Sequence, residues 1–235
     1  MTMSDDAELR EVLLSHQRRY PRLQIQDLVK LVFQNEFAGG HMIADPQSSL
    51  ERLREECRAL ADNQGDEEPS DVFVNIGNGL CRLQLAAIGG TGIHLTTVNQ
   101  FFVNTARMRR GDLASLEQKL EVLRACCQAG SLPHSPDDLD DFLLTYRAQG
   151  YPAISHSAVY RDHYKPAYRV VDSAYRDHFA LFCRVDALFE SQGTVCVAID
   201  NPSAGESALA ALLSRVYDSN LLAISPGPGK AGQPQ

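Results

Sequence analysis

The sequence contains no Cys-X-X-Cys motif, no excess of basic residues and no hydrophobic run of the ~18 residues needed to span a bilayer. Its six cysteines are too sparse for a disulfide scaffold, and their spacing predicts neither a zinc ribbon nor a thioredoxin-type site. The 30 acidic residues outnumber the 22 basic ones, which argues against a nucleic-acid-binding face. Residues 1–10 are polar and acidic, unlike a signal peptide. We therefore expect a cytoplasmic protein without nucleic-acid or membrane partners.

The composition is nevertheless that of a folded protein. Hydrophobic residues make up 44% and charged residues 22% of the chain, which excludes wholesale disorder. At roughly 150 residues per domain, a chain of 235 residues corresponds to one or two domains.

Helical periodicity dominates residues 5–190. Gly39-Gly40 marks the end of an apolar helix that begins at Gln26, and Asp45-Pro46 is typical of the cap and first turn of the next helix. Asp112 and Ser135-Pro136 are start signals of the same kind. We predict helices over about 9–16, 26–38, 46–60, 97–109, 112–127, 136–149, 157–164 and 168–190.

A β-hairpin is predicted between the third and fourth of these helices. Val72, Val74 and Ile76 alternate with other residues, and the alternation resumes at Leu83 after a Gly-Asn-Gly sequence at 77–79. Glycine and asparagine tolerate the left-handed conformations that a tight hairpin turn requires.

The pattern changes after residue 193. An apolar run at 194–199 predicts a strand, residues 209–216 predict a helix, and 221–224 predict a second strand. Together they form a βαβ unit over 193–224. Residues 225–235 are rich in proline and glycine, and we expect a disordered tail there.

The loop of this unit resembles the phosphate-binding loop of uridine-kinase-like P-loop proteins. Residues 198–207 read Ala-Ile-Asp-Asn-Pro-Ser-Ala-Gly-Glu-Ser and lead into an apolar helix. Asn201 stands in place of the first glycine, the loop is one residue short, and Glu206 replaces the phosphate-binding lysine. A carboxylate there repels phosphate, so the resemblance implies a degenerate, truncated loop that does not turn over ATP.

The preceding 190 residues resemble the helical region that precedes such a module in bacterial proteins of unassigned function. The segments that carry this resemblance are 26–37, 40–43, 76–83 and 156–169. The resulting expectation is a mainly α domain over 5–190 with one β-hairpin, followed by a short truncated βαβ appendage.

One candidate site is the corner between the second and third predicted helices, formed by Asn35, Glu36, His41 and Asp45. A histidine beside a carboxylate is a plausible general acid or base, which makes Glu36 and His41 a catalytic pair and Asn35 and Asp45 substrate-binding residues. Alternatively, Glu36 and Asp45 satisfy helix ends and His41 fills the corner. A metal would need a further ligand such as His163, and the spacing matches no zinc motif.

A second candidate site is a cationic cluster at 160–169. Arg161, Lys165 and Arg169, with His163 among them, could clamp a phosphate or carboxylate, and Arg82 after the hairpin turn could join them. The alternative is a solvated helix surface with packed tyrosines.

The sequence therefore predicts an enzyme or ligand-binding protein that acts on a small anionic, possibly phosphorylated, metabolite. No cofactor or metal is assigned, and a homo-oligomer is compatible with the sequence. The alternative is a non-catalytic accessory or regulatory domain, or the remnant of a longer kinase-like protein. The enzyme hypothesis gains support if the 35–45 corner and the 161–169 cluster share one pocket, and it fails if they lie on opposite faces.

Overall fold

The structure is a computed structural model that describes residues 3–39, 43, 45–62, 71–109, 111–199 and 207–218. The chain divides into two compact units, 1–195 and 196–235. The described residues are mainly helical, as predicted, and they include one small antiparallel sheet. The elements of unit 1 are α1 (Met3–Arg19), α2 (Ile25–Phe37), α3 (Pro46–Asp62), β1 (Phe73–Gly77), β2 (Leu80–Gln84), the 3-10 helix η2 (Leu85–Ile88), α4 (Leu95–Met108), α5 (Leu113–Gln128), α6 (Pro136–Ala148), α7 (Ala158–Tyr164), β3 (Tyr168–Asp172), α8 (Ser173–Asp177) and α9 (Phe179–Gln192).

The predicted caps begin the helices as expected. Asp45 Oδ1 accepts a hydrogen bond from Ser48 N at 2.9 Å at the start of α3, and Asp112 Oδ1 accepts one from Ser115 N at 2.9 Å at the start of α5. These bonds satisfy backbone donors that have no partner within the first helical turn.

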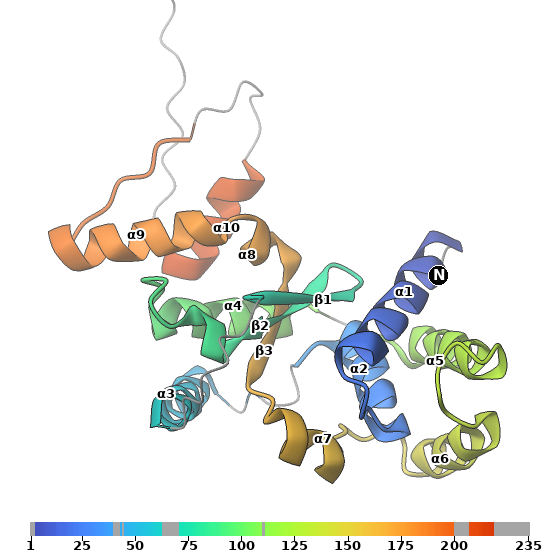
Figure 1. Ribbon diagram of the computed structural model, residues 1–235. Helices are drawn as coiled ribbons and strands as arrows, with labels where there is room; N and C mark the ends of the chain where they lie inside the picture. Colours follow the sequence, from blue (N-terminus) through green and yellow to red (C-terminus); the bar gives the residue numbers. More distant parts are fainter. Residues whose placement is uncertain are drawn as a thin grey trace, which may run out of the picture. The chain divides into compact units, whose positions relative to one another are not determined.

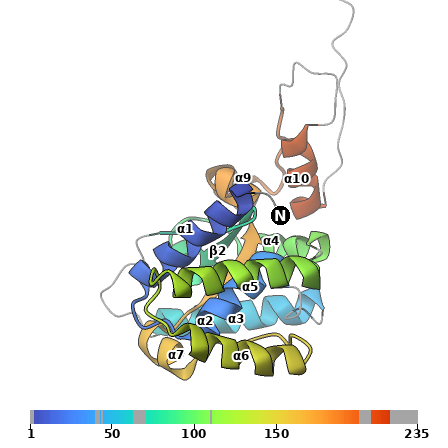
Figure 2. The same ribbon diagram turned by 90° about the vertical axis from the view of Figure 1, so that its right-hand side faces the viewer.

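The sheet separates two groups of helices in unit 1. Figure 1 shows α1, α2, α5 and α6 on one side of the strands and α3 and α4 on the other. Figure 2 shows α5 running between α1 and α6. The main core fills the first side, where Ile76, Leu80 and Val170 from the sheet pack with leucines and valines of the helices. On the other side Phe101 of α4 stacks on Tyr175 of α8, with ring centroids 4.2 Å apart.

The predicted hairpin is confirmed, but the sheet has a third strand. Its order is β1-β2-β3, and both pairs are antiparallel. Residues 168–172 were predicted to begin a helix, and this prediction is wrong because Tyr168, Val170 and Val171 pair with the open edge of β2. Aromatic and β-branched residues favour such half-buried pairing, and Pro166 disfavours a helix just before it.

The predicted strand at 194–199 is also wrong, because these residues have no regular secondary structure. An apolar run forms a stable strand only when it pairs with another strand. Within the described residues, the sheet contains β1, β2 and β3 alone, and none of them pairs with residues 194–199. Unit 2 contains helix α10 (Ala208–Tyr217), capped by Ser207, which confirms the helix predicted at 209–216. The P-loop-like residues 200–206, the strand predicted at 221–224 and the tail 225–235 lie outside the described residues.

Candidate functional site

Helix α2 carries an unusual number of buried polar side chains. Asp27, Lys30, Gln34, Asn35 and Glu36 are each at most 7% exposed. A polar group that loses water without gaining a hydrogen bond destabilises the fold, so each of these groups needs a partner. Their partners form two clusters, one at each end of the helix.

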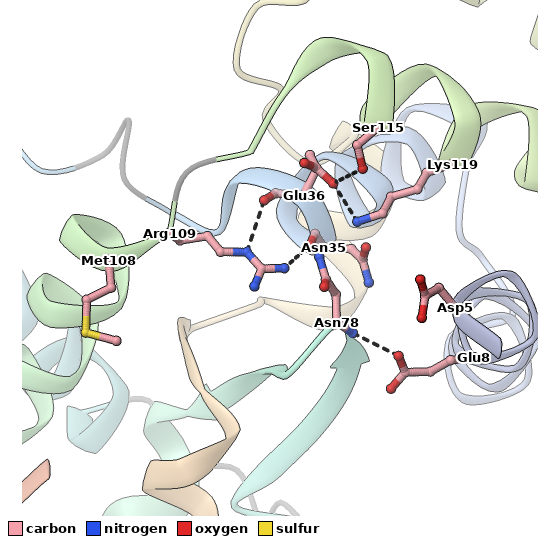
Figure 3. Close-up of a pocket in the computed structure, with 9 residues that line it drawn as sticks. All are labelled: Asp5, Glu8, Asn35, Glu36, Asn78, Met108, Arg109, Ser115 and Lys119. Atoms are coloured by element: carbon pink, nitrogen blue, oxygen red, sulfur yellow. Dashed lines mark hydrogen bonds and ion pairs between the residues drawn. The ribbon is translucent and has the colours of Figure 1, made fainter. Parts of the chain in front are cut away.

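The cluster at the C-terminal end of α2 lines a pocket of about 490 Å³, shown in Figure 3. The wall is assembled from α1, α2, the β1–β2 turn, the end of α4 and the first turns of α5. Nine residues line it: Asp5, Glu8, Asn35, Glu36, Asn78, Met108, Arg109, Ser115 and Lys119. We call this cavity the α2–α5 pocket.

Glu36 joins α2 to the start of α5. Its Oε2 accepts hydrogen bonds from Lys119 Nζ at 2.6 Å and Ser115 Oγ at 2.8 Å, and its Oε1 accepts one from Asp112 N at 2.9 Å. Burial alone would raise the pKa of Glu36, but these donors outweigh it and hold the pKa below its ordinary value. Glu36 is therefore ionised and structurally engaged.

Asn35 has one polar atom without a partner. Its Nδ2 donates to Ile76 O at 2.7 Å, which fixes the orientation of the amide, and its main-chain O accepts from Asn78 Nδ2 at 2.7 Å. The remaining acceptor, Oδ1, is buried and has no hydrogen-bond partner. Figure 3 places this amide between Lys119 and the hairpin, on the pocket side of α2.

The hairpin approaches Asn35 closely because residue 77 is glycine. Gly77 has φ of +76°, and a Cβ at this position would lie 2.8 Å from Asn35 Nδ2. Both the left-handed backbone and the close contact disfavour a side chain here.

Arg109 closes the C-terminal end of α2. Its Nε donates to Glu36 O at 3.3 Å and its Nη2 donates to Asn35 O at 3.2 Å. A cation at this end of a helix is favoured by the helix dipole. Within the described part of the chain, Nη1 of Arg109 makes no hydrogen bond, so the guanidinium keeps donor capacity beside Asn35.

The cluster toward the N-terminal end of α2 is a hydrogen-bonded chain that we call the His156 relay. His156 Nδ1 bonds to Asp27 Oδ1 at 2.8 Å, and Tyr168 Oη bonds to His156 Nε2 at 2.6 Å. Gln34 Nε2 donates to Tyr168 Oη at 3.2 Å, and Gln34 Oε1 accepts from Arg82 Nη2 at 2.7 Å. The guanidinium carbon of Arg82 also lies 4.5 Å from the centre of the Tyr168 ring.

The relay is built around a neutral histidine. Burial lowers the pKa of His156 to about 4, despite the opposing effect of Asp27. Asp27 also accepts hydrogen bonds from Ser157 Oγ at 2.6 Å and Ser157 N at 2.9 Å, which ties residues 156–157 to α2. An acid, an imidazole and a phenol in this order could pass a proton. No member of the relay lines the α2–α5 pocket.

The structure brings together only some of the residues proposed from the sequence. Asn35 and Glu36 share the α2–α5 pocket, and Asp45 caps α3. Arg82 lies on β2, 2% exposed, in the relay. His41 lies outside the described residues.

The proposed anion clamp is not assembled as one unit. Arg169 is buried on β3, and both of its terminal nitrogens bind Glu56 of α3, at 2.8 and 3.0 Å. Arg161 and Lys165 are exposed on and just after α7, as is His163, whose ring lies edge-on to Tyr164. None of these four residues lines the α2–α5 pocket.

Several site residues were not identified from the sequence. Lys119 and Ser115 lie on a face of α5 that also carries Leu116 and Leu120. A lysine at a position next to this apolar face is the signal in the sequence that could have indicated a buried charge. Asp27 and Gln34 are polar residues that lie among the apolar positions of α2, which is a comparable signal for the relay.

Two further features concern the described residues alone. Within them, no group of three or more histidine, cysteine or acidic side chains is arranged to hold a metal ion. None of their helices combines the length and apolar character needed to cross a membrane.

Comparisons with known proteins returned no match: no protein-family model, no curated protein and no solved structure matches the chain.

Proposed function

We propose that the protein binds a small metabolite with an anionic group in the α2–α5 pocket. The observation that carries this proposal is Asn35 Oδ1, a buried acceptor without a partner on the pocket wall. Unsatisfied buried polar atoms are rare in folded proteins, and a pocket with a few converging polar groups is the usual form of a small-molecule site.

The anion would bind at Arg109. Its guanidinium has already lost part of its hydration to the carbonyls of Asn35 and Glu36, and its Nη1 is available. The charge of Lys119 is balanced by Glu36, which takes one of its three N–H donors, and the other two donors can bind a ligand oxygen. Charge-assisted hydrogen bonds of this kind are stronger than neutral ones, and arginine suits carboxylates and phosphates.

Binding is better supported than catalysis by Glu36. Three donors stabilise its carboxylate, and a carboxylate with a lowered pKa is a weak base. The Glu36–His41 acid–base pair remains a proposal with a direct test. If His41 contacts the ligand, His41→Ala should abolish ligand-induced stabilisation with little change in the ligand-free melting temperature. If His41 instead has a structural role, the ligand-free melting temperature itself should fall.

The relationship to uridine-kinase-like proteins, with a degenerate P-loop after the helical unit, remains a proposal that rests on the sequence. It is compatible with a binding function because Glu206 argues against ATP turnover. The competing proposal is an accessory or regulatory domain that binds no metabolite.

A thermal-shift screen at fixed ionic strength tests the proposed function. Small carboxylates, inorganic phosphate, sugar phosphates and nucleotides are compared on wild type, Arg109→Gln and the surface double variant Arg161→Gln/Lys165→Gln. A ligand that prefers the folded state raises the melting temperature. We expect saturable stabilisation that is lost in Arg109→Gln and kept in the surface variant.

If stabilisation is instead kept in Arg109→Gln and lost in the surface double variant, the anion binds at α7, as the sequence analysis predicted. No saturable stabilisation by any anion would favour the accessory-domain proposal. The surface variant also controls for the general stabilisation that phosphate and sulfate give by exclusion from protein surfaces.

A further inference from the structure

We infer that the ligand of the α2–α5 pocket is a carboxylate with a hydrogen-bond donor on the adjacent carbon, an α-hydroxy or α-amino acid. This inference rests on the proposed function and narrows it to one chemical class. Three observations carry it: the charge of the pocket wall, the hydrogen-bonding groups on the wall that still lack partners, and the contact that holds two of these groups together.

The wall favours a single negative charge over a double one. Its ionisable side chains are three carboxylates, Asp5, Glu8 and Glu36, against two cations, Arg109 and Lys119. Because Glu36 is already paired with Lys119 at 2.6 Å, Arg109 is the cation left to bind a ligand. A phosphate dianion beside the carboxylate of Glu8 would meet repulsion that a carboxylate meets only half as strongly.

The wall also requires a donor from the ligand. Asn35 Oδ1 can only accept, and its amide cannot reverse because Nδ2 is held by Ile76 O. Glu8 uses Oε2 to accept from Asn78 N at 3.1 Å, which leaves Oε1 as a second acceptor. Asn35 Oδ1 is already buried and unpaired in the ligand-free protein, so a ligand with a carboxylate alone gains nothing from it, whereas a ligand with a donor gains a hydrogen bond.

A hydroxyl and an ammonium group both meet this need. A hydroxyl can donate to Asn35 Oδ1 and accept one of the spare N–H groups of Lys119. An ammonium group can donate to the same atom and gain from the carboxylates of α1. Both groups supply the hydrogen-bond donor that Asn35 Oδ1 requires. Titration of the protein with hydroxy acids and with amino acids distinguishes the two.

Contact between Arg109 and Asn35 brings the two ligand-binding groups to one corner of the pocket. Arg109 Nη2 is bonded to the main-chain oxygen of Asn35, the residue whose side-chain oxygen is unpaired. The anion-binding and donor-binding points therefore belong to one residue and its direct neighbour, which suits substituents on adjacent carbons. Met108, 50% exposed and also on the wall, offers an apolar surface for the rest of the ligand.

Matched ligand triplets test the inference by isothermal titration on the full chain. One triplet is propionate, L-lactate and L-alanine, and a longer one is hexanoate, 2-hydroxyhexanoate and norleucine, with inorganic phosphate as a further probe. We expect the hydroxy or amino member of at least one triplet to bind about 10-fold or more tighter than its unsubstituted acid, because it satisfies Asn35 Oδ1. Which of the two binds identifies the donor.

Arg109→Gln should remove this binding, and Glu8→Gln should weaken the amino acid more than the hydroxy acid. Equal affinity across both triplets, or tighter binding of phosphate, would overturn the inference and leave the proposed function intact. If neither the triplets nor any anion of the thermal-shift screen binds, both fail. If only anions outside this class bind, the inference alone fails.

Discussion

Glu36 of α2 and Lys119 of α5 form an ion pair of 2.6 Å between side chains that are only 7% and 6% exposed. The two residues are 83 positions apart in the sequence, and their pairing joins α2 to α5. Both side chains line the α2–α5 pocket. Burial, with a smaller contribution from the positive charge of Arg109, lowers the pKa of Lys119 below its ordinary value despite the opposing effect of Glu36. The positive charge of Lys119 compensates the buried carboxylate of Glu36.

Removing Lys119 should therefore destabilise the fold. Lys119→Met leaves the Glu36 carboxylate buried without its cation, and we expect a loss of about 3 kcal/mol in the free energy of unfolding, measured by urea titration. The double variant Glu36→Gln/Lys119→Met removes both charges and should recover part of that loss. Arg18→Met, which breaks the solvent-exposed pair with Glu11, should leave the urea midpoint close to wild type. A Lys119→Met variant as stable as wild type would contradict the assigned role.

The hairpin turn provides a matched pair of glycine substitutions. Gly77→Ala and Gly79→Ala both place a side chain at positive φ, +76° and +70°, which costs about 1–2 kcal/mol. Only Gly77→Ala also forces a Cβ to 2.8 Å from Asn35 Nδ2, whereas nothing lies within 4 Å at Gly79. Gly77→Ala should lower the melting temperature clearly more than Gly79→Ala. Equal losses would mean that the turn does not press on Asn35.

The His156 relay predicts a specific pH dependence of stability. The unfolded chain takes up a proton on this histidine near pH 6.5, whereas the folded protein does so only near pH 4, because burial lowers the pKa of His156. The free energy of unfolding should therefore fall as the pH drops from about 6.5 to 4, by up to ~1.4 kcal/mol per pH unit for this group. His16, whose pKa burial lowers to about 3, adds to the same trend.

Urea titrations between pH 7 and pH 4 measure this slope. His156→Gln should make it shallower, whereas Tyr168→Phe, which removes a partner but keeps the imidazole, should lower stability and retain most of the slope. Asp27 acts in a lower window, because its pKa is lowered and its contribution disappears only below its ordinary value of 3.8. An unchanged slope in His156→Gln would show that this histidine is not held neutral.

Local signals were sufficient for most helices and for the hairpin. Asp45 and Asp112 act on backbone groups three residues away, so the sequence alone predicts the starts of α3 and α5. The β1–β2 turn is equally local. Residues 168–172 could not be assigned this way, because their strand conformation depends on the free edge of β2, more than 80 residues earlier.

The site was predictable only in part, for the same reason. Asn35 and Glu36 were identified because they lie at a helix end, but their partners Arg109 and Lys119 come from α4 and α5. Arg169 was proposed to bind an anion. Its guanidinium instead donates hydrogen bonds to Glu56, a residue that is distant in the sequence. Only the tertiary fold decides which charges are already paired.

The proposed resemblance of residues 198–207 to a degenerate P-loop predicts no productive ATP site. Glu206 replaces the lysine that would reach the terminal phosphates, and the loop is one residue short. Isothermal titration with Mg-ATP should show no binding in the micromolar range. Saturable binding accompanied by hydrolysis would overturn this interpretation of residues 198–207.

The most direct test of the central claim follows the side chains of Asn35 and Arg109 by ¹H–¹⁵N NMR during titration with L-lactate and L-alanine, or with the best anion from the screen. Binding in the α2–α5 pocket predicts saturable shifts of the Asn35 Nδ2 and Arg109 Nε resonances with one dissociation constant, and no saturable shift of Arg161 Nε. Saturable shifts of Arg161 with unchanged Asn35 and Arg109 signals would contradict the account.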